Sequence, residues 1–206
     1  MDLLLTLTLG LVVAWIAKAS QQRRRIAFLA GFLSRYSIEK HIETLTQGYL
    51  RAIGEADPER RDQVLRLLQA SEQELCRQVS QLAADVAAAD AASTRVSKLP
   101  LWLPFASSLA ASFDMREALR IHARGICQSI ESDAGASPRD RAFTISAELF
   151  LLQHTCHWFC RSKWVASARM AALHRTSYQQ LVAAVLPQTR SAYLGVVGFG
   201  GGGRAG

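Results

Sequence analysis

Hydrophobic and polar positions divide the chain into an uncharged N-terminal run and a longer part with helical periodicity. Residues 3–17 read LLLTLTLGLVVAWIA and contain no charged side chain. Crossing the hydrocarbon of a bilayer takes roughly 20 helical residues, so the run needs its neighbours, and Lys18 can place its ammonium among the headgroups. Trp15 lies where an interfacial aromatic side chain is expected. The pattern predicts one transmembrane helix over residues 1–20.

Positive charge gathers on only one side of this apolar run. Asp2 and the terminal amine precede it, whereas a basic group follows it and consists of Lys18, Arg23, Arg24 and Arg25. Because positively charged flanks stay in the cytoplasm, we expect the N-terminus outside and the remaining chain in the cytoplasm of a bacterial-type inner membrane. These cations and Trp15 are the expected contacts to membrane lipid, above all to an anionic inner leaflet.

Two other interpretations of the first helix stay open. Ala17-Lys18-Ala19 resembles the small-residue site of a cleaved signal peptide, although no positively charged side chain precedes the run and three arginines follow the supposed cut. A run this short can also be the buried first helix of a soluble protein. The placement of the charges favours the anchor over both.

The chain after the anchor is predicted to be helical throughout. Residues 26–33 are apolar again but too few to cross a bilayer, so residues 21–36 are interpreted as a basic and apolar juxtamembrane helix that continues the span. From residue 37, apolar positions recur every three or four residues, which is typical of amphipathic helices. We therefore expect an all-α bundle over residues 37–197 and a flexible glycine-rich tail over residues 198–206.

A heptad-like pattern marks the helix that is expected from Pro58 to about Asp90. Its apolar seam repeats every seven residues and includes Leu68, Leu75 and Leu82, while Glu72 occupies a neighbouring slot. Such a coiled-coil seam packs against another helix of the same chain or against a second copy. The glutamate and the small number of heptads favour an intramolecular bundle, and a homo-oligomer formed through these leucines is the alternative.

Two later stretches are unusually apolar. Residues 138–161 are apolar around most of the helix circumference, which indicates a central helix. Residues 99–113 carry no charge and contain two prolines, so we do not expect them to span a membrane. Either Trp102 and Phe105 insert among lipid headgroups beside the anchor, or the segment closes one end of the bundle. No strand is expected.

Composition adds limits on size and redox state. The chain has 206 residues, a length that suits one domain, and 50% of them are hydrophobic, which is enough for a core. Its formal net charge is +7. Four cysteines are too few for a disulfide framework; they are Cys76, Cys127, Cys156 and Cys160. In the cytoplasm they would be thiols, whereas an oxidising compartment would pair them. Their redox state therefore reports on the orientation of the anchor.

The candidate for metal chemistry is a group of soft ligands on the central helix: His154, Cys156, His157 and Cys160, to which His122 of the preceding helix could add. Thiolate and imidazole at one-turn spacing can bind zinc or a haem iron. The cysteine pair and the histidine pair, however, point roughly 100° apart on a helix. The alternative is buried thiols and hydrogen-bonded histidines, so no cofactor is the leading expectation.

No catalytic motif accompanies the bundle, and a non-enzymatic role is favoured. We expect a membrane-anchored scaffold or assembly factor that binds an unidentified protein partner through a basic ridge, formed by Arg116, Arg120, Arg124 and Arg161. The alternatives are a metal- or haem-binding sensor or enzyme centred on His154–Cys160, and a self-associating structural membrane protein. Nucleic acid is not an expected partner, because no reader motif accompanies the arginines.

Overall fold

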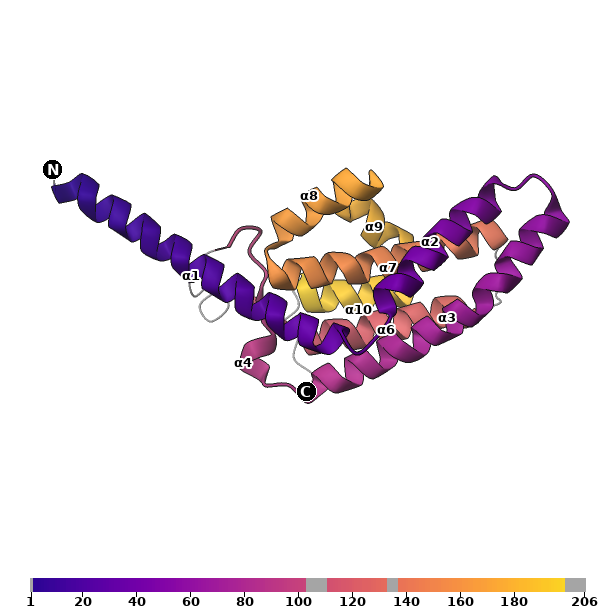
Figure 1. Ribbon diagram of the computed structural model, residues 1–206, viewed down its shortest axis with the longest axis horizontal. Coiled ribbons are helices and arrows are strands. Elements are labelled where there is room, and N and C mark those ends of the chain that lie inside the picture. The colour runs from indigo at the N-terminus through magenta and orange to yellow at the C-terminus, as the bar shows by residue number, and fades with distance from the viewer. Residues whose placement is uncertain (1, 103–110, 133–136, 199–206) are drawn as a thin grey trace.

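The computed structural model describes residues 2–102, 111–132 and 137–198. Most of these residues are helical, which confirms the predicted all-α class (Figure 1). In chain order the helices are α1 (Asp2–Leu33), α2 (Ile38–Gly54), α3 (Pro58–Ala87), α4 (Ala91–Thr94), α6 (Met115–Glu131), α7 (Pro138–Cys160), α8 (Lys163–His174), α9 (Tyr178–Ala184) and α10 (Pro187–Val197). The predicted tail beyond residue 198 lies outside the described residues, as does Phe105.

A short antiparallel ribbon corrects the expectation that the chain contains no strand. Strand β1 (Arg95–Ser97) pairs with β2 (Ser112–Asp114), and Val96 lies opposite Phe113. Both of these central side chains are buried. With three residues in each strand, the ribbon is too short to produce a visible alternation of apolar and polar positions.

Helix α1 runs without interruption from the apolar N-terminal run into the bundle, as the sequence predicted. Its first half projects away from the other helices (Figure 1), and the leucines there are exposed. Its second half packs on the bundle, where Leu29 is buried and the ring of Phe28 lies 5.8 Å from that of Phe159 in α7. One helix thus has an uncovered apolar half and a half that belongs to the core.

Local capping signals place the helix starts where the sequence predicted them. Asp57 accepts a hydrogen bond from the amide of Glu59 at the start of α3, and Ser137 accepts one from Asp140 at the start of α7. Each cap is followed by a proline in the first helical turn. Because the missing proline N–H would have no partner at that position, proline starts a helix without a lost hydrogen bond.

The heptad seam of α3 faces the inside of the bundle. Leu75 and Leu82 are almost completely buried and Leu68 nearly so. A Cβ atom at Gly48 of α2 would lie only 2.5 Å from a methyl carbon of Leu68, so glycine permits this close approach of α2 and α3. The intramolecular use of the seam is therefore confirmed. These three leucine side chains are covered within one chain, so the structure gives no support to self-association through them.

A buried ionic cluster joins four helices around Glu72. This carboxylate accepts a hydrogen bond from the hydroxyl of Tyr49 in α2 at 2.5 Å and two from the guanidinium of Arg141 in α7 at 2.9 and 2.7 Å. Arg141 also donates to the carbonyl of Ile130 in α6 at 2.8 Å. Burial and the adjacent carboxylate raise the pKa of Tyr49, so its hydroxyl keeps the proton that it donates.

We expect Arg141→Ala to lower the free energy of unfolding by about 3–5 kcal/mol, because it leaves the carboxylate of Glu72 buried without its cation. Arg139→Ala is the matched control: its exposed guanidinium lies over the ring of Phe143, and its loss should change stability by at most about 0.5 kcal/mol. Denaturant unfolding of both detergent-solubilised variants measures the difference. Equal losses would show that the cluster contributes no more than a surface contact.

Candidate functional site

The free half of α1 is the clearest functional feature of the structure. Among the described residues, one helix, Leu3–Leu33, is long and apolar enough to cross a membrane or to act as a signal sequence, and its most apolar window is not buried at all. Leu3 is 74% exposed and Trp15 is 69% exposed. A contiguous apolar surface of this kind requires a cover.

The basic residues that follow the apolar run divide into two groups. Lys18, Arg23 and Arg24 are exposed. Arg25 instead donates to the carbonyls of Phe159 at 3.0 Å and Arg95 at 2.8 Å, and burial lowers its pKa. Arg25 was expected to contact lipid, but the structure uses its guanidinium to fasten α1 to the end of α7 and to β1.

The structure does not assemble the predicted metal site on α7. His154 is hydrogen-bonded through Nε2 to Ser167 of α8 at 3.1 Å, and His122 is hydrogen-bonded through Nε2 to Thr155 at 2.9 Å. Cys156 and Cys160 are half-buried free thiols. Over the described ranges, no three His, Cys, Asp or Glu side chains are grouped so that they could hold a metal ion. These histidines instead join α7 to its neighbours.

Burial fixes the protonation states of these groups. Desolvation lowers the pKa of His122 to about 3 and that of His154 to about 4, while it raises the pKa of Cys156 to about 12. Both histidines are therefore neutral at pH 7, and Cys156 is a thiol and not a thiolate nucleophile.

The lowered pKa of His154 predicts a specific dependence of stability on pH. Below about pH 6.5 the histidine binds a proton in the unfolded chain but not in the folded one, so stability falls with decreasing pH until the folded group titrates near pH 4. His154→Gln removes this titration and can keep a hydrogen bond to Ser167. Its unfolding free energy should fall less steeply between pH 6 and pH 5, by about 1.4 kcal/mol per pH unit. Identical slopes would contradict the assignment.

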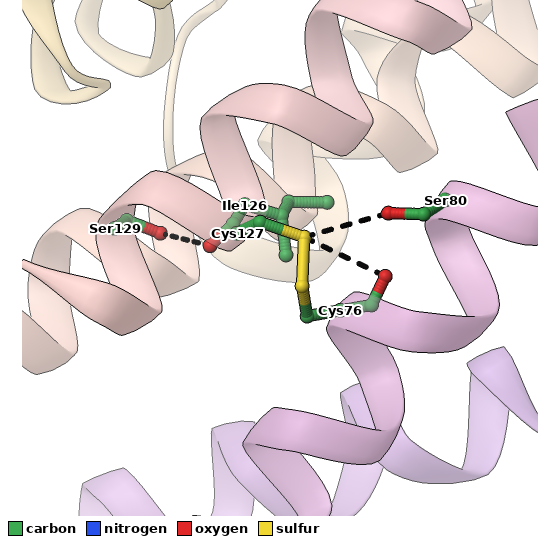
Figure 2. Close-up of a disulfide and its surroundings, with 5 residues drawn as sticks. All are labelled: Cys76, Ser80, Ile126, Cys127 and Ser129. Atoms are coloured by element: carbon green, nitrogen blue, oxygen red, sulfur yellow. Dashed lines mark hydrogen bonds between the residues drawn. A yellow bond between two sulfur atoms is a disulfide. The ribbon is translucent and has the colours of Figure 1, made fainter.

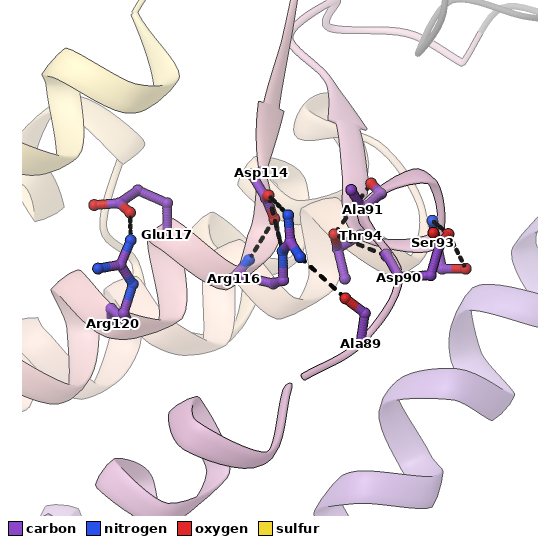
Figure 3. A network of polar contacts seen from close by, with 9 residues as sticks. All are labelled: Ala89, Asp90, Ala91, Ser93, Thr94, Asp114, Arg116, Glu117 and Arg120. Carbon is purple, nitrogen blue, oxygen red and sulfur yellow. Dashed lines mark hydrogen bonds and ion pairs between the residues drawn. The ribbon is translucent and has the colours of Figure 1, made fainter. Parts of the chain in front are cut away.

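The predicted arginine ridge is not a continuous free surface. Arg116 forms an ion pair with Asp114 and donates to the carbonyl of Ala89 at 3.0 Å, which closes the network at the ends of α3, α4 and β2 (Figure 3). Arg120 pairs with Glu117. Arg124 is exposed on the same helix, whereas Arg161 donates to Gln22 of α1 at 2.7 Å. The structure thus uses Arg116 to connect elements of the fold and places Arg161 beside α1.

A disulfide joins two helices of the bundle. Cys76 of α3 and Cys127 of α6 are bonded across the interface of these helices, with Cα atoms 5.0 Å apart (Figure 2). They are 51 residues apart in the sequence. The sequence predicted thiols for a cytoplasmic domain and paired cysteines for an oxidising compartment, so this bond bears directly on the orientation.

A cleft with an empty volume of about 970 Å³ lies between α2, α7 and α8. Glu39 and Glu43 lie on its α2 wall, and Arg169 lies on its α8 wall. The lining also includes apolar and ring-bearing side chains, namely Ile42, Phe150, His157, Met170, Leu173 and His174. His174 stacks on Phe150 with ring centroids 3.9 Å apart. The cleft therefore combines an apolar interior with opposite charges on facing walls.

His157 is the predicted metal ligand that this cleft contains. Burial and the nearby guanidinium of Arg169 lower its pKa, and the carboxylate of Glu39 acts in the opposite direction. The charges of Arg169 and Glu39, on the two walls of the cleft, thus both act on this imidazole. Sequence reasoning did not find the cleft, because its residues come from three helices and no local pattern connects them.

No protein-family model, curated protein or solved structure matches the chain. Function is therefore inferred from the uncovered half of α1, the cleft and the residues that connect them.

Proposed function

We propose that the protein is held in a bacterial-type inner membrane by residues 1–20 and that its helical domain acts as a scaffold or assembly factor by binding another protein. The main support for the anchor is the difference in exposure between the two halves of α1. Its leucines are exposed up to residue 11, whereas Leu29 is buried in the bundle. A lipid bilayer supplies the cover that the fold leaves out.

The flanking charges support an N-terminus outside and a domain in the cytoplasm. Lys18, Arg23 and Arg24 are free to interact with anionic headgroups. Positively charged flanks set the orientation at the time when the helix inserts. Insertion comes before any pairing of cysteines in the folded domain. Cytoplasmic reductants then keep Cys76 and Cys127 as facing thiols that oxidation can close. In the structure these two cysteines are bonded, and this observation supports the opposite orientation, with the domain in an oxidising compartment.

Thiol trapping in intact cells distinguishes these orientations. In a Cys156→Ala/Cys160→Ala variant, Cys76 and Cys127 are the cysteines that remain for labelling. We expect both to react with a membrane-permeant maleimide without prior reduction. A membrane-impermeant maleimide should leave them unlabelled until the cells are opened. If labelling needs a reductant in freshly quenched cells, the domain lies on the oxidising side and the proposed orientation fails.

For the partner we propose an amphipathic helix whose apolar stripe enters the cleft between α2 and α8. Leu173 is 59% exposed on the rim of this cleft. The ion pairs found in the described parts of the chain do not include Glu39, Glu43 or Arg169. A basic side chain of the partner facing the α2 wall and an acidic one facing Arg169 would complement both walls.

A photo-crosslinking amino acid at Leu173 tests this surface in cells. We expect one discrete protein adduct that disappears when Glu39→Lys and Glu43→Lys reverse the charge of the α2 wall. The matched control places the same amino acid at Leu67, which is 79% exposed on α3 and lies outside the cleft. Equal adducts at both sites, or an adduct at position 173 that ignores the charge reversal, would exclude the cleft as the binding surface.

A further inference from the structure

The bundle contacts α1 immediately after the proposed span. Trp102 donates its indole N–H to the side chain of Gln21, and Arg161 donates to Gln22. At a rise of about 1.5 Å per residue, residues 3–20 cover roughly 27 Å, close to the thickness of the hydrocarbon layer. Gln21 and Gln22 therefore lie at the level of the lipid headgroups, together with the side chains that bind them.

Large apolar side chains are exposed beside this contact. Leu101 is 59% exposed, Trp164 is 62% exposed and Val165 is 40% exposed. The backbone amide of Trp164 donates to the carbonyl of Pro100 at 3.0 Å, so the first turn of α8 lies against the segment that carries Leu101 and Trp102. Figure 1 shows this beginning of α8 at the end of the bundle from which the free half of α1 emerges.

A hollow in the same place presents cationic groups. It has an empty volume of about 320 Å³, and Arg25, Arg161, Leu99, Trp102 and Trp158 are among the residues that line it. Tryptophan is enriched at membrane interfaces because its ring is apolar and its N–H is polar. Of the two guanidinium groups, that of Arg161 is exposed, and an exposed guanidinium beside such rings attracts the phosphates of anionic lipids.

We infer that this membrane-proximal surface, formed by Leu101, Trp102, Trp164, Val165 and Arg161, lies on the bilayer interface and is a second membrane contact of the protein. The inference depends on the proposed span of α1, because that span sets the depth of Gln21. The bilayer is the occupant that follows from continuity with α1. From the sequence, insertion of Trp102 and Phe105 among the headgroups was one of two alternatives. The structure turns the Trp102 N–H toward α1 and presents Leu101 and Trp164 outward.

The four tryptophans allow a direct test in the full-length protein. The chain is labelled with 5-fluorotryptophan, reconstituted in a phosphatidylcholine bilayer that contains phosphatidylglycerol, and assigned by single Trp→Phe substitutions. Nitroxide lipids labelled near the headgroup or deep in the acyl chain then broaden the fluorine signals of nearby rings. Trp158 is almost completely buried in the bundle and serves as the internal control, while Trp15 reports on the span.

We expect the shallow nitroxide to broaden Trp164 several-fold more than Trp158, and both nitroxide lipids to broaden Trp15. A broadened Trp15 with a Trp164 signal as sharp as that of Trp158 would overturn the second contact and leave the anchor intact. A sharp Trp15 would overturn the anchor itself. If the Trp164 signal changes only with the ratio of protein to lipid and never with nitroxide, the surface binds another copy of the chain and the inference is wrong.

Discussion

The bundle depends on the buried ion pair and hydrogen bonds that the carboxylate of Glu72 forms with Arg141 and Tyr49. The charge of this carboxylate is removed from water in the middle of a leucine seam, a position that is costly unless every oxygen is satisfied. Tyr49, Arg141 and the carbonyl of Ile130 complete the cluster, so α2, α3, α6 and α7 must meet at one point. An apolar residue at position 72 would pack equally well against several neighbours. The hydrogen bonds of the ionic cluster are directional and need Tyr49 and Arg141 at fixed positions, and the observed arrangement places α2 beside α7 and so creates one side of the cleft.

In the proposed anchoring, helix α1 connects this fixed arrangement to the membrane. Arg25 binds carbonyls at the end of α7 and in β1, and Phe28 and Leu29 pack in the core, all within one continuous helix. Between the free half and the packed half no proline or turn interrupts the hydrogen bonds of the backbone. The direction of the apolar half relative to the bundle is therefore set by the fold and not by a flexible linker, and under the proposed anchoring this also sets the orientation of the bundle to the bilayer.

Local sequence signals predicted much of the fold, whereas contacts between residues far apart in the sequence could not be predicted from it. Pro58 and Pro138 marked helix starts correctly because capping involves only neighbouring residues. The continuous first helix and the central α7 followed from long apolar patterns. Arg25 looked like a cation for lipid because nothing nearby in the sequence shows that two backbone carbonyls will face it. The Cys76–Cys127 pair, the β ribbon and the cleft were missed for the same reason, since each depends on residues that only the tertiary structure brings together.

The position of the cleft limits what kind of partner the domain can meet. Phe150 of α7 lines the cleft. The backbone carbonyl of Phe159, in the same helix, accepts a hydrogen bond from Arg25 of α1. These residues are separated along α7 by about 14 Å at the helical rise. Because α7 is held rigidly to α1 at this end, the cleft lies within two or three helical turns of the point where α1 leaves the bundle. If α1 spans a membrane as proposed, a partner helix that enters this cleft approaches the membrane surface, and the proposed partner is then a membrane-bound or membrane-recruited protein.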